Sequence, residues 1–150
     1  MIRKIVAQRA RTTFERVNRH DYDRILQDAL PNIRHRFAGD HALGGERNDK
    51  AHLRLWFERL GRLVPDLQLT VTDVWVKGGV RRAVVIVRWT AEASLLDGTP
   101  YRNHGVHIIH LHNLKVASID VNEDSQAVAR ALERQAGAGL AEALAAPITS

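Results

Sequence analysis

The sequence has no cysteine, a single methionine and only four prolines among its 150 residues. Without cysteine the chain has no disulfide, no thiolate metal ligand and no cysteine nucleophile, so a packed core must stabilise it. No apolar run approaches the roughly 18 residues that a membrane span needs. Basic residues at positions 3, 4, 9 and 11 interrupt the first 14 residues, so no signal-peptide core is present there. We therefore expect a cytoplasmic protein without a membrane segment.

The composition is that of an ordinary globular chain, with 45% apolar and 26% charged residues. A length of 150 residues falls in the usual range of one domain. Since no internal repeat or linker divides the sequence, we expect a single domain over residues 1–150. No glycine-rich phosphate-binding loop is present, so no nucleotide cofactor is expected, and no other cofactor is indicated.

The formal net charge of +5 lies entirely in the first 36 residues. Residues 1–36 hold nine Lys or Arg and four Asp or Glu, whereas residues 37–150 hold thirteen of each kind. The basic side chains alternate with acidic ones and do not form a continuous stripe with exposed aromatic residues, as a nucleic-acid interface would. The pattern favours a solvated helix surface, and nucleic acid is not expected as a partner.

Apolar residues recur at helical spacing in four segments. These segments cover residues 2–17, 22–30, 50–64 and 125–135. Asn48 or Asp49 caps the third segment and Asp124 or Ser125 caps the fourth, since these residue types cap helices. From residue 136 onward the sequence is rich in Ala and Gly, so we expect residues 136–150 to form a weakly ordered tail.

Alternating apolar and polar residues predict strands between these helices. The predicted strands cover residues 33–38, 67–77, 80–94, 101–112 and 115–122. Gly78-Gly79 and Asp97-Gly98 are typical hairpin turns, so the last four strands form an antiparallel meander. The predicted fold class is α+β, a cone-like curved antiparallel sheet around three N-terminal helices, with a short C-terminal helix. A pocket would lie at the mouth of the cone, next to the glycine-rich loop 39–49.

The stretch Phe37-Ala38-Gly39-Asp40-His41 precedes the third helix, and the long curled meander follows that helix. With the order of elements, these features resemble nuclear transport factor 2-like proteins over roughly residues 2–134. Within that superfamily the chain looks most similar to the SnoaL-like polyketide cyclase and ketosteroid isomerase-like branch. The superfamily includes isomerases, dehydratases, epoxide hydrolases, binding proteins and catalytically silent domains, so the resemblance implies the fold more strongly than the chemistry.

The resemblance carries two candidate catalytic residues onto this sequence. Asp40 matches the catalytic base of the ketosteroid isomerases, and His107 matches a histidine on the penultimate strand of the cyclases. The isomerase tyrosine that donates to the oxyanion falls at Thr13. The catalytic aspartate of the cyclases falls at Val121, and Asp120 should point to the opposite face. Each mechanism therefore lacks one residue, and no oxyanion donor is identified.

Each candidate also has a purely structural interpretation. A loop carboxylate such as Asp40 commonly caps a turn, whereas in an apolar pocket its pKa would rise and suit a general base. His107 shares its strand face with Ile109 and Leu111, so it is either a pocket residue or a core histidine bonded to a neighbour. Further candidates for ligand binding are His41, Trp56, Trp89, Tyr101 and Asn103.

The opposite face of the same strand carries further histidines. His110 and His112 have a spacing that can chelate a metal, but no carboxylate or third histidine is evident, so no metal site is expected. The outer sheet face holds Arg88, Thr90, His104, His110 and His112, with Val106 and Ile108 assigned by the twist. This mixture is too apolar for a solvated surface and too polar for a second core, so we predict a homodimer through it.

Three functions stay open at this point. The first is an enzyme of isomerase, cyclase or dehydratase type, acting on a small apolar carbonyl or hydroxyl compound with Asp40 and His107 as an acid/base pair. The second is a non-catalytic domain that binds a small molecule in the same pocket. The third is an interaction domain whose exposed sheet is the working surface. The placement of Asp40 relative to His107 distinguishes the first of these from the others.

Overall fold

Four α-helices form where the apolar periodicity predicts them. The computed structural model describes all 150 residues, with α1 (Ile2–Asn18), α2 (Tyr22–Gln27), α3 (Lys50–Leu63), α4 (Ser125–Gly137) and a 3₁₀ turn, η1 (Ala141–Leu144). The side chains of Asp49 and Asp124 cap α3 and α4 by accepting backbone N–H groups. The second helix ends earlier than predicted, because the backbone at Asp28 and Ala29 already pairs with a strand: Val116 N donates to Asp28 O over 2.8 Å.

Six strands form one sheet. They are β1 (Ala29–Phe37), β2 (Gly45–Arg47), β3 (Gln68–Gly78), β4 (Arg82–Ser94), β5 (Pro100–His112) and β6 (Lys115–Glu123), in the order β2-β1-β6-β5-β4-β3. Strands β3 to β6 are the predicted antiparallel meander. Two features were not predicted: β1 runs parallel to β6, and β2 pairs with β1 inside the glycine-rich loop. A strand as short as β2 is too brief for alternation to reveal it.

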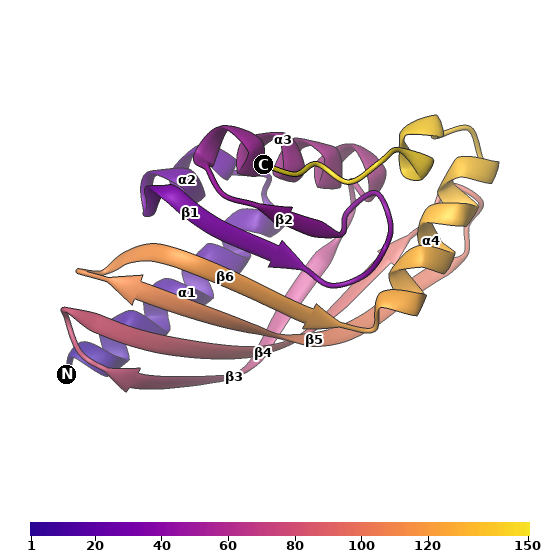
Figure 1. Ribbon diagram of the computed structural model, residues 1–150. Coiled ribbons are helices and arrows are strands. Elements are labelled where there is room, and N and C mark those ends of the chain that lie inside the picture. Colours follow the sequence, from indigo (N-terminus) through magenta and orange to yellow (C-terminus); the bar gives the residue numbers. More distant parts are fainter.

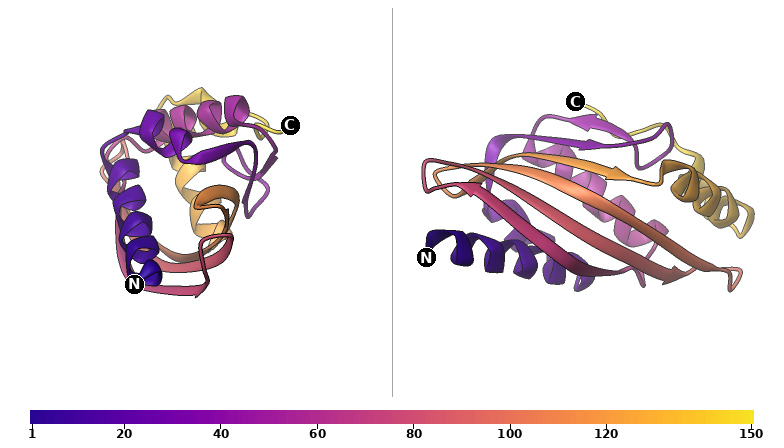
Figure 2. Two further views of the ribbon diagram at one scale, coloured as in Figure 1. Left: turned by 90° about the vertical axis from the view of Figure 1, so that its left-hand side faces the viewer. Right: turned by 90° about the horizontal axis from the view of Figure 1, so that it is seen from below.

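The sheet curls around the helices to give a cone (Figures 1 and 2). Helix α1 packs against β3 and β4, and α3 packs against β1. Helix α4 contacts β5 and lies across the end of the cone where β6 stops (Figure 1). No helix covers the outer face of the sheet (Figure 2). The predicted α+β cone is therefore confirmed, and none of its helices is both long and apolar enough to span a membrane.

Apolar side chains fill the cone in two buried clusters. One gathers around α3 and includes Leu53, Trp56 and Phe57. The other lies between α1 and the middle of the sheet and includes Phe14 and Val87. Residues of both clusters line a cavity in the interior of the cone.

The residues after α4 return to the edge of the sheet. The 3₁₀ turn η1 packs against α4, and Ser150 N donates to Glu46 O on β2 over 3.3 Å. The Asn48 side chain donates to Ser150 O over 2.8 Å. The last residues thus lie beside β2 (Figure 1), and the weak order expected of residues 136–150 stays a prediction.

We predict that Trp56→Ala lowers the free energy of unfolding by about 3–5 kcal/mol. The indole is 4% exposed, packs against Phe37 and Phe57, and donates to Leu43 O over 2.8 Å. Asp40→Asn is the control and should leave stability unchanged, because Asp40 is an exposed loop residue. Urea unfolding followed by circular dichroism measures both, and a larger loss for Asp40→Asn would make Asp40 a structural cap.

Candidate functional site

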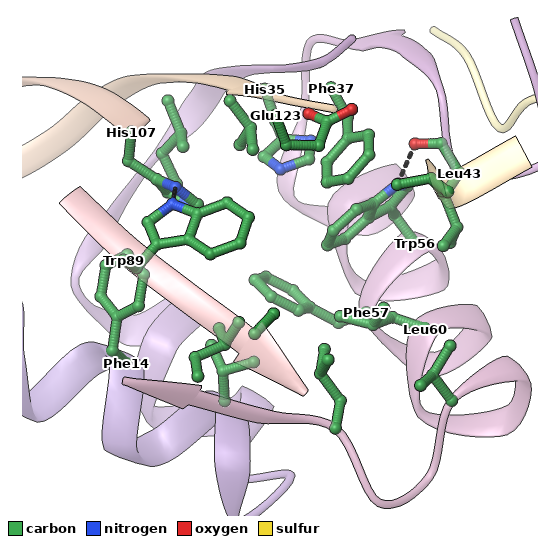
Figure 3. A pocket seen from close by; sticks show the side chains of 18 of the residues that line it. Phe14, His35, Phe37, Leu43, Trp56, Phe57, Leu60, Trp89, His107 and Glu123 are labelled. Atoms are coloured by element: carbon green, nitrogen blue, oxygen red, sulfur yellow. Dashed lines mark hydrogen bonds between the residues drawn. The ribbon is translucent and has the colours of Figure 1, made fainter. Parts of the chain in front are cut away.

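The interior of the cone contains a cavity of about 100 Å³ (Figure 3). Twenty of the 25 residues that line it are hydrophobic. A dry cavity of roughly 150 Å³ holds benzene, so this cavity fits at most about one small ring without movement of its walls. Its lining therefore favours a small apolar ligand.

Five polar side chains interrupt this apolar lining: Thr13, His35, His107, Glu123 and Gln135. Two of them are already used. Thr13 Oγ1 donates to the backbone of α1 over 3.0 Å, and Gln135 joins α4 to two backbone groups, over 2.7 and 2.9 Å. The other three keep polar atoms without a partner, and they are the groups that a ligand would meet.

His107 is held in one protonation state by Trp89. Trp89 Nε1 donates to His107 Nδ1 over 2.7 Å (Figure 3). Because an indole N–H can only donate, Nδ1 must be unprotonated, and the proton of the neutral ring resides on Nε2. Burial lowers the pKa of His107 to about 3. His107 is thus a neutral imidazole whose Nε2–H is free to donate into the cavity.

Glu123, the last residue of β6, is the carboxylate of the cavity wall. Both of its carboxyl oxygens are buried and have no hydrogen-bond partner. Burial raises the pKa of Glu123 to about 7, against smaller opposing effects of its own backbone N–H and of the Arg36 charge. A carboxyl group with this pKa exchanges its proton readily at neutral pH, which suits general acid/base chemistry.

The strand register brings Glu123 to the same face as His107. His107 lies opposite Val121, so Glu123 is its diagonal neighbour two residues further along β6. Gly105 lies between Trp89 and Glu123 on adjacent strands. A Cβ at Gly105 would lie 2.6 Å from Trp89 Cζ2 and 3.0 Å from Glu123 Cβ. The absence of a side chain at Gly105 therefore makes room for both.

His35 enters the cavity from β1. It is 2% exposed, and its ring packs against that of Trp56 at a centroid distance of 4.5 Å. Its Nδ1 is buried without a partner. Burial, helped by the charge of Arg47, lowers the pKa of His35 well below its ordinary value. His35 is therefore a second neutral imidazole in the same cavity.

Asp40 lies in the exposed loop between β1 and β2 and does not line the cavity. With His41 it borders a shallow surface pocket beside α4 and η1. His41 Nδ1 accepts from Leu43 N over 3.2 Å, its ring edge meets Phe37, and burial lowers its pKa. The structure thus does not bring Asp40 and His107 together around the cavity.

Of the remaining candidates for ligand binding, three line the cavity and one supports a residue that lines it. Trp56, Trp89 and Tyr101 line the cavity, whereas Asn103 does not. Asn103 Nδ2 donates to the Tyr101 hydroxyl over 2.9 Å, and its Oδ1 accepts from Asp124 N over 3.2 Å. Burial raises the pKa of Tyr101. Asn103 therefore orients Tyr101 and joins β5 to the start of α4.

Sequence reasoning missed His35 and Glu123. The alternation of residues between the two faces of a strand could have located both. His35 lies between Ile33 and Phe37 on one face of its strand, and Glu123 lies two residues after Val121, on the same face as Val121. The predicted last strand stopped at residue 122, one residue short. No group of three or more His, Asp or Glu side chains is placed to hold a metal ion.

We predict that Glu123→Gln stabilises the protein at high pH only. Because the folded pKa is about 7 and the ordinary value is 4.5, ionisation of Glu123 opposes folding. Stability is therefore lost as pH rises between these two values. Above pH 7 the variant should be more stable by about 1–3 kcal/mol, and below pH 4.5 it should equal the parent.

Urea unfolding from pH 4 to pH 8.5 measures this difference. Glu92→Gln on the outer face of β4 is the matched control, because its carboxylate is exposed. A Glu123→Gln curve parallel to that of the control at every pH would contradict the prediction.

Comparisons with known proteins show the family and the fold of this chain. The family model of the SnoaL-like domain matches residues 10–119. No curated protein matches the chain.

Three solved structures share the fold. PrhC from Penicillium brasilianum superposes with a TM-score of 0.76 at 15% identity, covering 91% of each chain. An NTF2-like protein of unknown function from Burkholderia pseudomallei has a TM-score of 0.72 at 19% identity, covering 83% of this chain and 95% of its own. TerC, co-crystallised with polyporic acid, has a TM-score of 0.70 at 20% identity, covering 81% of this chain and 92% of its own. Since the family model spans most of the sequence, the chain belongs to the SnoaL-like domain family, and its fold is that of the nuclear transport factor 2-like proteins.

Proposed function

We propose that the cavity binds a small apolar compound with a carbonyl or hydroxyl group and that Glu123 and His107 act on it as an acid/base pair. The observation that supports this most is the Glu123 carboxyl group, buried without a partner in an apolar wall with a pKa of about 7. A purely structural carboxylate would be hydrogen-bonded or ion-paired. TerC, which shares the fold, was crystallised with polyporic acid, so this fold can hold a small organic molecule.

The two groups divide the work of moving a proton. The ionised Glu123 carboxylate accepts a proton from the carbon next to the carbonyl, and the Nε2–H of His107 donates to the carbonyl oxygen as negative charge develops there. The protonated Glu123 then returns the proton to another atom of the same intermediate. Isomerisation, cyclisation and dehydration each contain this enolate-forming step, so the proposal fits all three reaction types.

The carboxylate in this proposal differs from the one that the family resemblance indicates. Asp40 matches the isomerase base in sequence, but it lies in an exposed loop outside the cavity. Glu123 lies two residues after Val121, the position of the cyclase aspartate, and on the same face of β6. Glu123 is therefore the preferred base, and the Asp40–His107 pair is the competing assignment.

We expect the protein to catalyse the exchange of the α-protons of cyclopentanone for deuterium in deuterium oxide. Proton NMR measures the rate of this exchange. Glu123→Gln should reduce the exchange rate by about 10²- to 10⁴-fold, the usual contribution of a positioned general base. His107→Gln should also reduce it, and Asp40→Asn should not.

The alternatives give different outcomes in the same assay. A loss in Asp40→Asn with full activity in Glu123→Gln would make Asp40 the base. Cyclopentanone that binds, as measured by saturation transfer, but does not exchange would favour the second function, a non-catalytic binding domain. The apolar lining of the cavity, with 20 hydrophobic residues of 25, is compatible with that alternative.

We also propose a homodimer formed through the outer sheet face. This face is free of helices (Figure 2). Trp75 on it is 46% exposed and is paired with Ile86, which is paired in turn with Ile108. The same face carries exposed polar residues: Arg88, Thr90, His104, His110 and His112. A cytoplasmic location stays a prediction from the sequence.

Light scattering at micromolar concentration should give about twice the chain mass of 16.9 kDa. Ile108→Arg should reduce this to the mass of one chain, because a charge in the centre of the interface opposes association. Val80→Arg is the control, since Val80 is 52% exposed in the turn between β3 and β4. A parent protein with the mass of one chain would contradict the dimer.

A further inference from the structure

Arg47 on β2 is a buried cation without an acidic partner. It is 0% exposed. One terminal nitrogen, Nη2, donates to Gly44 O over 2.9 Å, and the guanidinium lies 5.5 Å from the centre of the Trp56 ring. Its Nε and Nη1 have no partner. An unpaired buried charge normally costs stability, so Arg47 lowers the stability of the fold unless another group uses its charge.

His35 is the group that lies across from it. The Cα atoms of His35 and Arg47 are direct partners in the β1–β2 pair, and both side chains point inward and contact Trp56. Directly opposed residues have Cβ atoms about 4.5–5.5 Å apart. The unpartnered atoms are complementary, because Arg47 offers only N–H donors and the buried Nδ1 of His35 can accept.

We propose that Arg47 is a positioning residue that keeps the Nδ1 of His35 unprotonated and so places the ring proton on Nε2, the nitrogen left to face the cavity. No hydrogen bond joins the two side chains in the structure. The charge of the directly opposed guanidinium disfavours a proton on the His35 ring and attracts the lone pair of Nδ1. The other titratable groups near His35 are His107 from β5 and Glu123 from β6, which line the same cavity. From helix α3, the aromatic rings of Trp56 and Phe57 pack against it.

The consequence is a pair of matched donors. Trp89 fixes the tautomer of His107 from β4, and Arg47 fixes that of His35 from β2, so two neutral imidazoles offer Nε2–H groups to one cavity. These two N–H groups are donors to an oxyanion, which the side chain at Thr13, the position of the isomerase tyrosine, does not provide. A carbonyl oxygen accepts two hydrogen bonds, and it keeps both as it becomes an enolate. This inference rests on the proposed function. Two donors that face one cavity favour carbonyl compounds over alcohols as the substrate class.

Nitrogen-15 NMR of histidine-labelled protein tests the positioning role directly, because protonated and unprotonated ring nitrogens resonate far apart. The signals of His35 and His107 are assigned by their loss in His35→Phe and His107→Phe. In the parent protein we expect both rings to carry the proton on Nε2. In Arg47→Met we expect His35 to shift toward the Nδ1–H tautomer or to begin to titrate, while the signals of His107 stay unchanged.

Trp89→Phe is the matched control and should alter the tautomer of His107 but not that of His35. Arg47→Met should also melt at the same temperature as the parent or higher, since it removes an unpaired buried charge. An unchanged His35 spectrum in folded Arg47→Met would overturn the proposal. If Arg47→Met does not fold, the parent spectrum decides, because a proton on Nδ1 of His35 contradicts the proposal by itself.

The two proposals fail in different measurements. Deuterium exchange at the full rate in Glu123→Gln contradicts the proposed role of Glu123 as the base, but it does not affect the NMR test of Arg47 and His35. An Nδ1–H tautomer of His35 removes the positioning role of Arg47 but leaves Glu123 and His107 as the acid/base pair.

Discussion

Charge is costly inside the cone, because 20 of the 25 residues around the cavity are hydrophobic and offer no hydrogen bonds to an ion. Because burial disfavours the charged form of each group, it lowers the pKa of a base and raises the pKa of an acid. It lowers the pKa of His107 to about 3 and raises the pKa of Glu123 to about 7. At neutral pH the imidazole is therefore a donor that cannot become a cation, and the carboxyl group is close to its point of half-ionisation. The same apolar surroundings thus give a carboxyl group suited to accept a proton at neutral pH and a neutral hydrogen-bond donor.

The sheet register turns these two tuned groups into neighbours. Trp89, Gly105 and Glu123 lie side by side on β4, β5 and β6, and the missing side chain at Gly105 lets the indole and the glutamate approach each other. The indole fills the wall of the cavity and also donates to His107. Packing and protonation are thus coupled at one residue, and any side chain at Gly105 would disturb both.

Stability and function oppose each other at several points of the site. The ionised form of Glu123 opposes folding above neutral pH, and Arg47 is buried without a counter-charge. The surface ion pairs, such as Arg36 with Asp120 on the outer face, carry no comparable cost because they keep solvent contact. In the proposed mechanism the costly groups are the ones that would meet the substrate or orient a residue that does.

The sequence by itself determined what depends on neighbours in the chain. Periodicity located the helices and the meander, the caps at Asp49 and Asp124 followed from residue type, and alternation turned His107 inward. The tertiary structure decided what depends on distant segments. The parallel pairing of β1 with β6 carries His35 to the cavity, and the path of the loop after β1 leaves Asp40 outside it. Local patterns report which face of an element is apolar, but burial, and with it the pKa of Glu123, is set by elements that meet only when the chain folds.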